Sequence, residues 1–285
     1  MTRTILILGR SGQLAQALFA RPAPDGFRWD AWGRETLDLA RDDVEARVRA
    51  AAPAAVINAA AHTGVDRAES EPEAAFALNR DAPGALARAA AALGAPFVHI
   101  STDYVFDGTK PSPYTEEDPL APLGVYGRSK AEGEALVRES GGRAAIIRTS
   151  WVYARAGANF VNTMLRLSEA RDEINVVADQ IGRPTWARDL ADACVGMTER
   201  LLLDDARAEG VFHYSGAGDA TWADFAEAIF AAARRPVRVK RITTEDYPTP
   251  AARPKNSRLD CSKIAALGIQ PRPWREALAL CIGGS

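Results

Sequence analysis

The stretch that decides the fold lies near the N-terminus and reads Thr4-Ile5-Leu6-Ile7-Leu8-Gly9-Arg10-Ser11-Gly12-Gln13-Leu14-Ala15. Its first five residues are continuously apolar, which predicts a short strand buried on both faces, as in a parallel sheet. Helical spacing follows over 13–20. Between them stands G-x-x-G-x-x-A, a turn whose glycines let backbone N–H groups approach a pyrophosphate. The turn predicts a dinucleotide site at Gly9 and Ser11, with a merely structural turn as the alternative.

Strand and helix patterns then alternate through the first 150 residues. Further strands are expected at 27–32, 54–58, 96–101 and 144–148, and helices at 43–52, 73–93 and 124–139. This alternation predicts an α/β fold, a Rossmann-type doubly wound parallel sheet with right-handed crossovers. Ligands of such sheets bind beyond the carboxyl ends of the strands, where this sequence places small and polar residues.

The alternation weakens after residue 150. Helices are expected at 159–170 and 187–203, and the proline-rich stretch 247–254 cannot lie inside a regular element. We therefore expect a dinucleotide-binding domain at 1–151. Residues 152–285 are expected to form mainly a smaller α/β substrate-binding lobe, with some elements returning to the sheet.

Composition excludes several classes of protein. The 285 residues carry 35 basic and 37 acidic side chains, a formal net charge of −2, so no nucleic acid or membrane partner is expected. No apolar run approaches the roughly 18 to 20 residues that span a bilayer, and the N-terminal run is too short for a signal peptide. The cysteines, Cys194, Cys261 and Cys281, are odd in number and scattered, which is typical of reduced thiols in the cytoplasm.

A Tyr-x-x-x-Lys pair carries the predicted chemistry. Tyr126 and Lys130 share one face of the helix expected at 124–139, and a nearby cation should lower the pKa of the phenol. A phenol tuned in this way is a usable general acid or base. Thr102, at the end of the fourth strand, could hydrogen-bond the same substrate oxygen. The alternative is an ordinary amphipathic helix beside a strand-end turn.

Two features after the second strand bear on the cofactor. Arg34 could accept the 2′-phosphate of NADPH and so favours NADPH over NADH, although a solvated surface arginine is the alternative. Asp38 and Leu39 follow at a position that should lie against the adenine. NADPH is therefore expected, with NADH possible.

Longer blocks of sequence resemble the dTDP-4-dehydrorhamnose reductase family, within the short-chain dehydrogenase/reductase superfamily. The similarity runs from the first strand to near residue 276. It is carried by the turn at 9–15 and by blocks at 58–66 (NAAAHTGVD), 101–108 (STDYVFDG), 122–127 (PLGVYG), 148–153 (RTSWVY), 179–185 (DQIGRPT) and 248–259.

The resemblance implies an activity and assigns residues to it. The family reduces the C4 ketone of dTDP-4-dehydro-6-deoxy-L-mannose to dTDP-L-rhamnose, the last step of dTDP-rhamnose biosynthesis, with NADPH or NADH. Carried over, Tyr126 protonates the ketone oxygen, Lys130 lowers the pKa of Tyr126 and binds the nicotinamide ribose, and Thr102 orients the carbonyl. The dinucleotide would be lined by Gly12, Gln13, Leu14, Asp38, Leu39, Ala61, His62 and Thr63. The substrate would be held by Asp103, Trp151, Arg253, Asn256 and Ser257, with Arg253 on the diphosphate.

One departure concerns a metal. Some members hold Mg²⁺ at a dimer interface through glutamates, and the matching positions here are Ala17 and Arg188. Alanine has no ligand atom and arginine would repel the ion, so no metal is expected and Mg²⁺ is doubtful. A monomer or weak homodimer follows.

Three alternatives stay open. A reductase of another nucleotide-linked 4-keto-6-deoxy sugar would share most of these blocks. A dehydratase or epimerase is less favoured, because dehydratases need a glutamate where this chain has Tyr104, next to Asp103. A non-catalytic NADP-binding regulatory subunit would share the fold and consume no cofactor.

Overall fold

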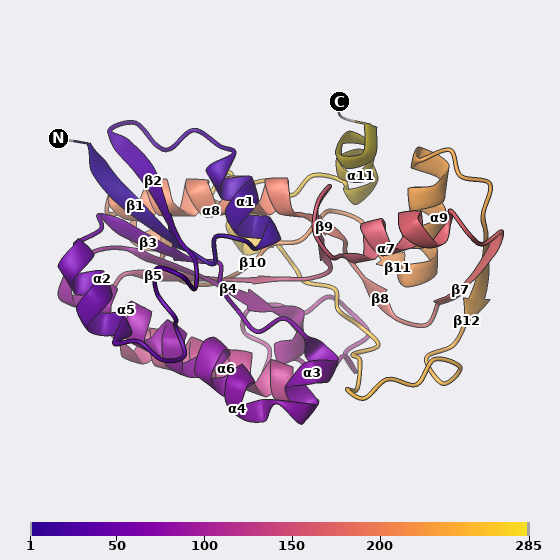
Figure 1. Cartoon of the computed structure of the whole chain (residues 1–285), viewed down its shortest axis with the longest axis horizontal. Coiled ribbons are helices and arrows are strands. Elements are labelled where there is room, and N and C mark those ends of the chain that lie inside the picture. The colour runs from indigo at the N-terminus through magenta and orange to yellow at the C-terminus, as the bar shows by residue number, and fades with distance from the viewer. Residues whose placement is uncertain (1, 284–285) are drawn as a thin grey trace.

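Strand β1 (Arg3–Leu8) lies inside a six-stranded parallel sheet in the computed structural model, which describes residues 2–283 (Figure 1). The strand order is β10-β5-β4-β3-β1-β2, and every neighbouring pair is parallel. The chain runs from β1 outward to β2 and returns to β3 on the other side of β1, so the order reverses between β1 and β3. Ligands of doubly wound sheets bind at such a reversal. The other strands are β2 (Phe27–Trp32), β3 (Ala55–Asn58), β4 (Phe97–Thr102), β5 (Ala144–Thr149) and β10 (Gly210–His213).

Helices cover both faces of the sheet because alternate strand residues are apolar on each side. On one face, Ile5 and Ile7 pack with Leu18 and Met197 from α1 (Gln13–Phe19) and α8 (Ala187–Leu202), beside α10 (Ser262–Ala265). The other face is covered by α2 (Val44–Ala51), α5 (Ala82–Ala92) and α6 (Val125–Glu139). The predicted fold class, a doubly wound Rossmann-type sheet, is confirmed.

The region expected to be one helix at 73–93 is more broken than predicted. It contains α4 (Pro72–Phe76), a π-helical turn η1 (Ala77–Asp81) and α5, and it is preceded by an unpredicted helix α3 (Val65–Ser70). Alanine-rich composition predicts helix but not its pitch. The π turn places an extra residue at a position beside the functional site, as described below.

The later part of the chain forms a second lobe with its own core. Three two-stranded pairs join β7 (Glu173–Val177) to β12 (Arg238–Ile242), β8 (Ile181–Gly182) to β11 (Ala220–Thr221), and β6 (Val152–Tyr153) to β9 (Thr185–Trp186). They pack with α7 (Phe160–Leu167), α9 (Trp222–Ala232) and α11 (Trp274–Gly283). A capping box between Thr221 and Asp224 starts α9. α8, η3 (Ala206–Ala208) and β10 belong to the first lobe, with β10 paired to β5. The division at residue 151 remains a prediction.

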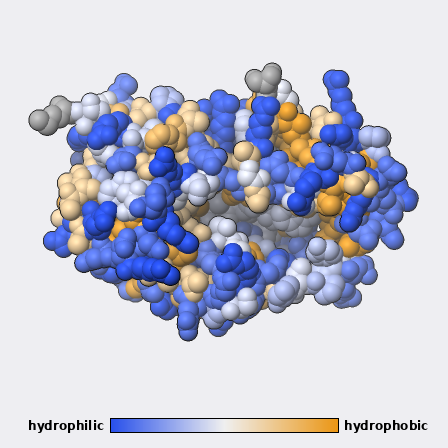
Figure 2. All heavy atoms as spheres, in the orientation of Figure 1, coloured by the Kyte–Doolittle hydropathy of each residue, from blue (hydrophilic) through white to orange (hydrophobic). Residues whose placement is uncertain are grey.

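The molecular surface is hollowed between the two lobes, on the face shown in Figure 2. The carboxyl ends of the sheet strands point toward this hollow. The proline-rich stretch 247–254 contains no helix or strand, as its prolines predict. Within residues 2–283, no helix is both long and apolar enough to cross a bilayer.

A buried ion pair fixes α6 on the sheet. Glu134 of α6 has no exposed surface, and its carboxylate accepts hydrogen bonds from Arg148 on β5 at 2.7 to 3.2 Å and from the hydroxyl of Ser101 on β4 at 2.5 Å. The Arg148 guanidinium also lies over the ring of Phe106 and near His213. Both charges are therefore paired and hydrogen-bonded, which a buried charge requires.

Replacing Arg148 by methionine should destabilise the fold strongly, because it leaves the Glu134 carboxylate buried without its partner. The free energy of unfolding, measured by urea denaturation, should fall by about 3–5 kcal/mol. The matched control is Arg88→Met, which removes the exposed 2.6 Å pair with Glu45 between α5 and α2 and should cost less than about 1 kcal/mol. Equal losses for the two variants would contradict this account of α6.

Candidate active site

A cavity of about 780 Å³ lies beyond the carboxyl ends of β1, β3, β4 and β5 and is closed on its other side by the second lobe. Both lobes contribute to its wall, since Gly157, Asn159 and Trp222 line it together with the strand ends. It contains most of the residues predicted from the sequence: Gly9, Ser11, Gly12, Gln13, Leu14, Arg34, Asp38, Leu39, Ala61, Thr63, Thr102, Asp103, Tyr126, Lys130 and Trp151. The sequence therefore located this cavity.

The glycine turn after β1 fits closely against the end of β3. Gly9 has a φ of +93°, and a Cβ there would lie 2.8 Å from the backbone nitrogen of Ala60. Only glycine meets both conditions. The turn is closed by a hydrogen bond from Gly12 N to Gly9 O and leads directly into α1. This turn therefore presents bare backbone to the cavity, at the reversal of strand order.

Contacts between side chains join the second lobe to the first across the cavity. Asn159 donates its amide to Gln13 Oε1 at 2.8 Å, beside the glycine turn. Trp151, directly after β5, stacks on Trp222 of α9 with ring centroids 3.6 Å apart and planes 11° apart. Trp151 lines the cavity as predicted, and one face of its indole is covered by Trp222.

Helix α6 approaches the end of β4 closely because Gly127 has no side chain. A Cβ at Gly127 would lie 2.1 Å from the carbonyl oxygen of Tyr104, which belongs to η2 (Asp103–Val105). The close packing brings Tyr126 edge-on to Tyr104, with ring centroids 5.5 Å apart. Tyr126 thereby reaches the Thr102 hydroxyl, whose hydrogen bond favours the phenolate of Tyr126.

The expectation that Lys130 lowers the pKa of Tyr126 is wrong for this structure. Burial raises the Tyr126 pKa to about 12, the nearby Asp103 carboxyl adds to the rise, and the Thr102 hydrogen bond offsets only part of it. Lys130 instead directs its Nζ at β4, where it donates to the carbonyl oxygen of Ile100 at 2.6 Å and lies 3.2 Å from His99 Nε2. Burial lowers the Lys130 pKa to about 8.

Two residues that line this part of the cavity have a buried polar atom without a hydrogen-bond partner. Asp103 is buried, which raises its pKa to about 6, and one of its carboxyl oxygens accepts from Thr102 while the other has no partner. The buried hydroxyl of Thr149, at the end of β5, also has none. Buried polar groups are nearly always hydrogen-bonded, so these atoms mark where a polar ligand fits.

Four of the predicted residues do not line the cavity. His62 is buried near Glu71, with 3.6 Å between its Nε2 and the carboxylate. Arg253 pairs with Asp66 at 2.8 Å. Asn256 and Ser257 are buried in the loop that follows, where the Asn256 amide donates to the carbonyl oxygens of Lys110 and Ser112. The Ser257 hydroxyl acts on Asp103 by lowering its pKa. Their binding roles remain predictions.

Sequence reasoning missed two residues that shape the site. The π turn places the amide of Asn79 between the backbone of His62 and the hydroxyl of Ser129, the residue before Lys130. Trp222 lies about 70 residues beyond Trp151 in the sequence, and no local pattern connects them. Both contacts are long-range, so neither had a sequence signal.

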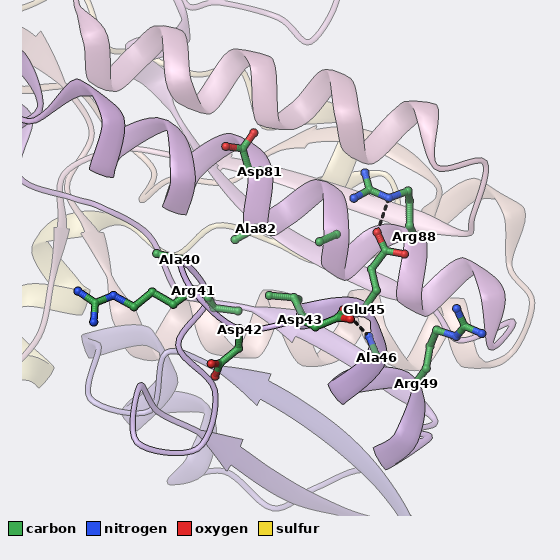
Figure 3. A pocket seen from close by; sticks show the side chains of 13 residues that line it. Ala40, Arg41, Asp42, Asp43, Glu45, Ala46, Arg49, Asp81, Ala82 and Arg88 are labelled. Atoms are coloured by element: carbon green, nitrogen blue, oxygen red, sulfur yellow. Dashed lines mark hydrogen bonds and ion pairs between the residues drawn. The ribbon is translucent and has the colours of Figure 1, made fainter.

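A second hollow, of about 740 Å³, lies between α2 and the start of α5 (Figure 3). Its acidic side chains already have partners: Glu45 binds Arg88 at 2.6 Å, and Asp43 caps α2 by accepting from Ala46 N. Asp42 accepts from the backbone N–H of Asp38. The hollow thus presents mainly satisfied surface charges.

The arrangement can bind a dinucleotide and move a proton. The Gly9 turn, the exposed Arg34 and the wall from Asp38 to Leu39 occupy one end of the cavity, and Tyr126 and Lys130 the other. A neutral phenol beside a threonine hydroxyl and a basic amine is suited to donate a proton to an oxygen that gains negative charge. The residues present therefore fit a nicotinamide dinucleotide and a carbonyl substrate. Among residues 2–283, no cluster of three or more His, Cys, Asp or Glu is arranged to hold a metal ion.

Known proteins resemble this chain along its whole length. The family described as RmlD substrate binding domain matches residues 2–284. A dTDP-4-dehydrorhamnose reductase from Sinorhizobium fredii is 49% identical over 280 residues, which cover 96% of this chain and 94% of that protein. The crystal structure of a dTDP-4-dehydrorhamnose reductase from Clostridium acetobutylicum has a TM-score of 0.92 at 37% identity and covers 98% of both chains. One from Bacillus anthracis, in complex with NADP, has a TM-score of 0.91 at 36% identity and covers 100% of both.

Gly127→Ala should destabilise the protein, because its methyl group would collide with the Tyr104 carbonyl oxygen and push α6 from η2. The free energy of unfolding in urea should fall by about 1–3 kcal/mol, as for other overpacked sites. Gly196→Ala is the control. It also lies inside a helix, α8, but its Cβ would meet only the end of the Ile269 side chain at 3.3 Å, so stability should hold or rise. A Gly127 variant as stable as the Gly196 variant would contradict the close approach.

Proposed function

The chain belongs to the RmlD substrate binding domain family, whose similar named members are dTDP-4-dehydrorhamnose reductases, and we propose that it reduces dTDP-4-dehydro-6-deoxy-L-mannose at C4 to dTDP-L-rhamnose with NADPH. This reaction is the last step of dTDP-rhamnose biosynthesis. The observation that carries the proposal is one cavity that joins the Gly9 turn to Thr102, Tyr126 and Lys130. The cofactor, when bound, supplies the hydride.

Tyr126 is the proton donor of this proposal. Its raised pKa, about 12, keeps the phenol protonated at neutral pH, which is the form that a reduction requires at its start. As hydride reaches C4, the ketone oxygen gains negative charge, the phenol O–H bond breaks and the alcohol O–H bond forms. The Thr102 hydroxyl accepts from the N–H of Tyr104 and donates its one proton to Asp103, and it would orient that oxygen by turning this proton toward it.

The remaining substrate contacts follow from charge and position. Asp103, with its unpartnered oxygen, and Trp151 would contact the sugar. Arg253 would serve the diphosphate only after exchanging its ion pair with Asp66 for phosphate oxygens, which its planar fork allows. Asn256 and Ser257 would support this loop from behind, next to Asp103. His62 would help to form the wall around the cofactor.

The cellular setting is part of the same proposal. We place the enzyme in the cytoplasm, where the buried free cysteines Cys194, Cys261 and Cys281 would stay reduced. We propose a monomer or weak homodimer without a bound metal, because Ala17 and Arg188 offer no carboxylate for Mg²⁺.

NADPH oxidation at 340 nm with enzymatically prepared dTDP-4-dehydrorhamnose tests the reaction, beside its C5-epimer precursor. We expect oxidation with the rhamno-configured ketone, and Tyr126→Phe should lower kcat by about 10²–10⁴-fold because the proton donor is lost. Cofactor affinity should be kept. Tyr153→Phe is the control, since its buried hydroxyl has no partner and lies in the second-lobe core.

Two outcomes would overturn parts of this proposal. Tight NADPH binding without turnover would point to a different keto-sugar, and then to a regulatory role. Full activity in Tyr126→Phe would remove the role assigned to Tyr126 alone.

Arg34→Ala should weaken NADPH binding by about tenfold or more and leave NADH binding unchanged, because only NADPH carries the 2′-phosphate that the guanidinium would pair with. Calorimetric titration with both cofactors measures this. Arg28→Ala, an exposed arginine of β2 outside the cavity wall, is the control and should change neither affinity. Equal loss for NADPH and NADH would rule out a phosphate contact.

A further inference from the structure

A chain of polar side chains runs through the core beneath the active site. Asn58 at the end of β3, His99 on β4 and Lys130 on α6 are 1%, 0% and 2% exposed. The Asn58 Nδ2 lies 3.1 Å from His99 Nδ1, and His99 Nε2 lies 3.2 Å from Lys130 Nζ. These side chains are almost entirely shielded from bulk water, so their proton positions are set mainly by one another.

The direction of the chain is fixed at its first member. The backbone N–H of Ala60, which can only donate, lies 3.1 Å from Asn58 Oδ1. The oxygen of the amide must therefore face Ala60, and the Nδ2 group, a donor, must face His99. Turning the amide over would set two donors against each other at Ala60.

The tautomer of His99 follows from this orientation. Its Nδ1 must accept the hydrogen bond from Asn58, so the single proton of the neutral imidazole sits on Nε2. Burial alone lowers the pKa of His99, which lies well below its usual value, so the ring stays neutral whether or not Lys130 carries a charge. The Nε2–H bond then points at the nitrogen of Lys130.

Two N–H donors cannot share one hydrogen bond. An ammonium at Lys130 would place a proton against the Nε2–H of His99, whereas a neutral amine offers a lone pair to it. The amine also keeps a hydrogen to donate to Ile100 O at 2.6 Å. Only the neutral amine satisfies the whole chain from Ala60 to Ile100.

We propose that Asn58 and His99 are positioning residues that stabilise the neutral, hydrogen-bond-accepting form of the Lys130 amine relative to its ammonium. The inference rests on the proposed function for the meaning of Lys130, but the protonation state itself does not depend on the substrate. Asn58 and His99 touch neither substrate nor cofactor; they act through the amine.

Other titratable groups also lie around Lys130. On α6, Glu134 favours the ammonium, but its carboxylate is paired with Arg148 of β5, and Tyr126 is neutral at physiological pH. Asp103 lies beyond β4, against Tyr126. β3 contributes only the neutral Asn58. Burial lowers the Lys130 pKa to about 8, and the N–H of His99 acts in the same direction.

The consequence for the reaction is a proton reservoir whose pKa matches the operating pH. After Tyr126 gives its proton to the product oxygen, a proton must return to the phenolate. Tyr126 and Lys130 line the same cavity, so the Lys130 ammonium can supply it through that cavity and the amine can regain one from water there. Turnover should therefore fall as pH rises through the Lys130 pKa. Without His99 as a donor, this alkaline limb should move to higher pH.

Lysine NMR tests the charge state directly. The chain has only five lysines, so ¹³Cε-labelled lysine gives a simple spectrum, and Lys130→Met assigns the signal. We expect Lys130 to titrate near pH 8 in the wild type. In His99→Gln, where an amide oxygen can face the ammonium, the titration should move up by about one pH unit or more. His99→Asn, which keeps an acceptor for Asn58 and removes the donor, should give the same direction and serves if the glutamine variant fails to fold.

His213→Gln is the matched control. His213 is also fully buried with a lowered pKa, but its Nδ1 faces the carbonyl oxygen of Tyr114 and its Nε2 faces Arg148, so it has the opposite tautomer and no contact with Lys130. Its variant should leave the Lys130 titration in place.

The pH dependence of kcat separates a positioning role of His99 from a role in packing alone. In both His99 variants the alkaline limb of the kcat–pH profile should shift by the same amount as the NMR titration, whereas a packing defect would lower kcat at every pH without moving the limb. An unchanged Lys130 titration in folded His99 variants would overturn the inference and leave the proposed reduction intact. If the NMR titration shifts as expected but the wild type shows no turnover, the inference about Lys130 stands and the proposed reduction is overturned.

Discussion

The fully buried carboxylate of Glu134 sets the position of the helix on which the site depends. Tyr126, Lys130 and Glu134 are spaced four residues apart, so they share one face of α6, and fixing the last fixes the other two. Arg148 and Ser101 bind that carboxylate from two adjacent strands, which orients the helix relative to both. A buried charge is costly unless every oxygen is paired, so the helix has one low-energy placement.

Local patterns predicted the parts of the molecule that local physics determines. Three features depend only on neighbours in sequence: the apolar run of β1, the turn at Gly9, and the four-residue spacing of Tyr126 and Lys130. The structure has the strand where it was predicted, and the turn and the pair line the cavity beyond the strand ends. The fold class followed from alternation alone. The helix expected at 73–93 was wrong in detail because alanine-rich composition predicts a helix but not a local π turn, and the contacts of Asn79 with His62 and Ser129 accompany that turn.

The pKa values and hydrogen-bond directions in the site could not be predicted from the spacing of residues in the sequence. The sequence shows that a lysine and a tyrosine share a helix face, but not that burial outweighs their attraction or that the amine turns toward β4. Nor does it show hydrogen-bond direction. His99 and His213 are both buried strand histidines, yet Asn58 forces one tautomer and the Tyr114 carbonyl the other. Their different roles arise from partners more than 40 residues away in sequence.

The junction between the lobes shows the same dependence on long-range contacts. Trp151 has a φ of +49°, a conformation that costs a bulky residue of order 1–3 kcal/mol. The strain is retained because the indole is fixed by the stack on Trp222 and packs closely on Gly182, where any Cβ would lie 2.5 Å from the ring. The strained backbone of Trp151 therefore directs its indole toward the second lobe, where it stacks on the indole of Trp222 in α9. Tyr126, Trp151 and Trp222 line the same cavity, so the second lobe helps to shape the site even though the proton chemistry lies in the first.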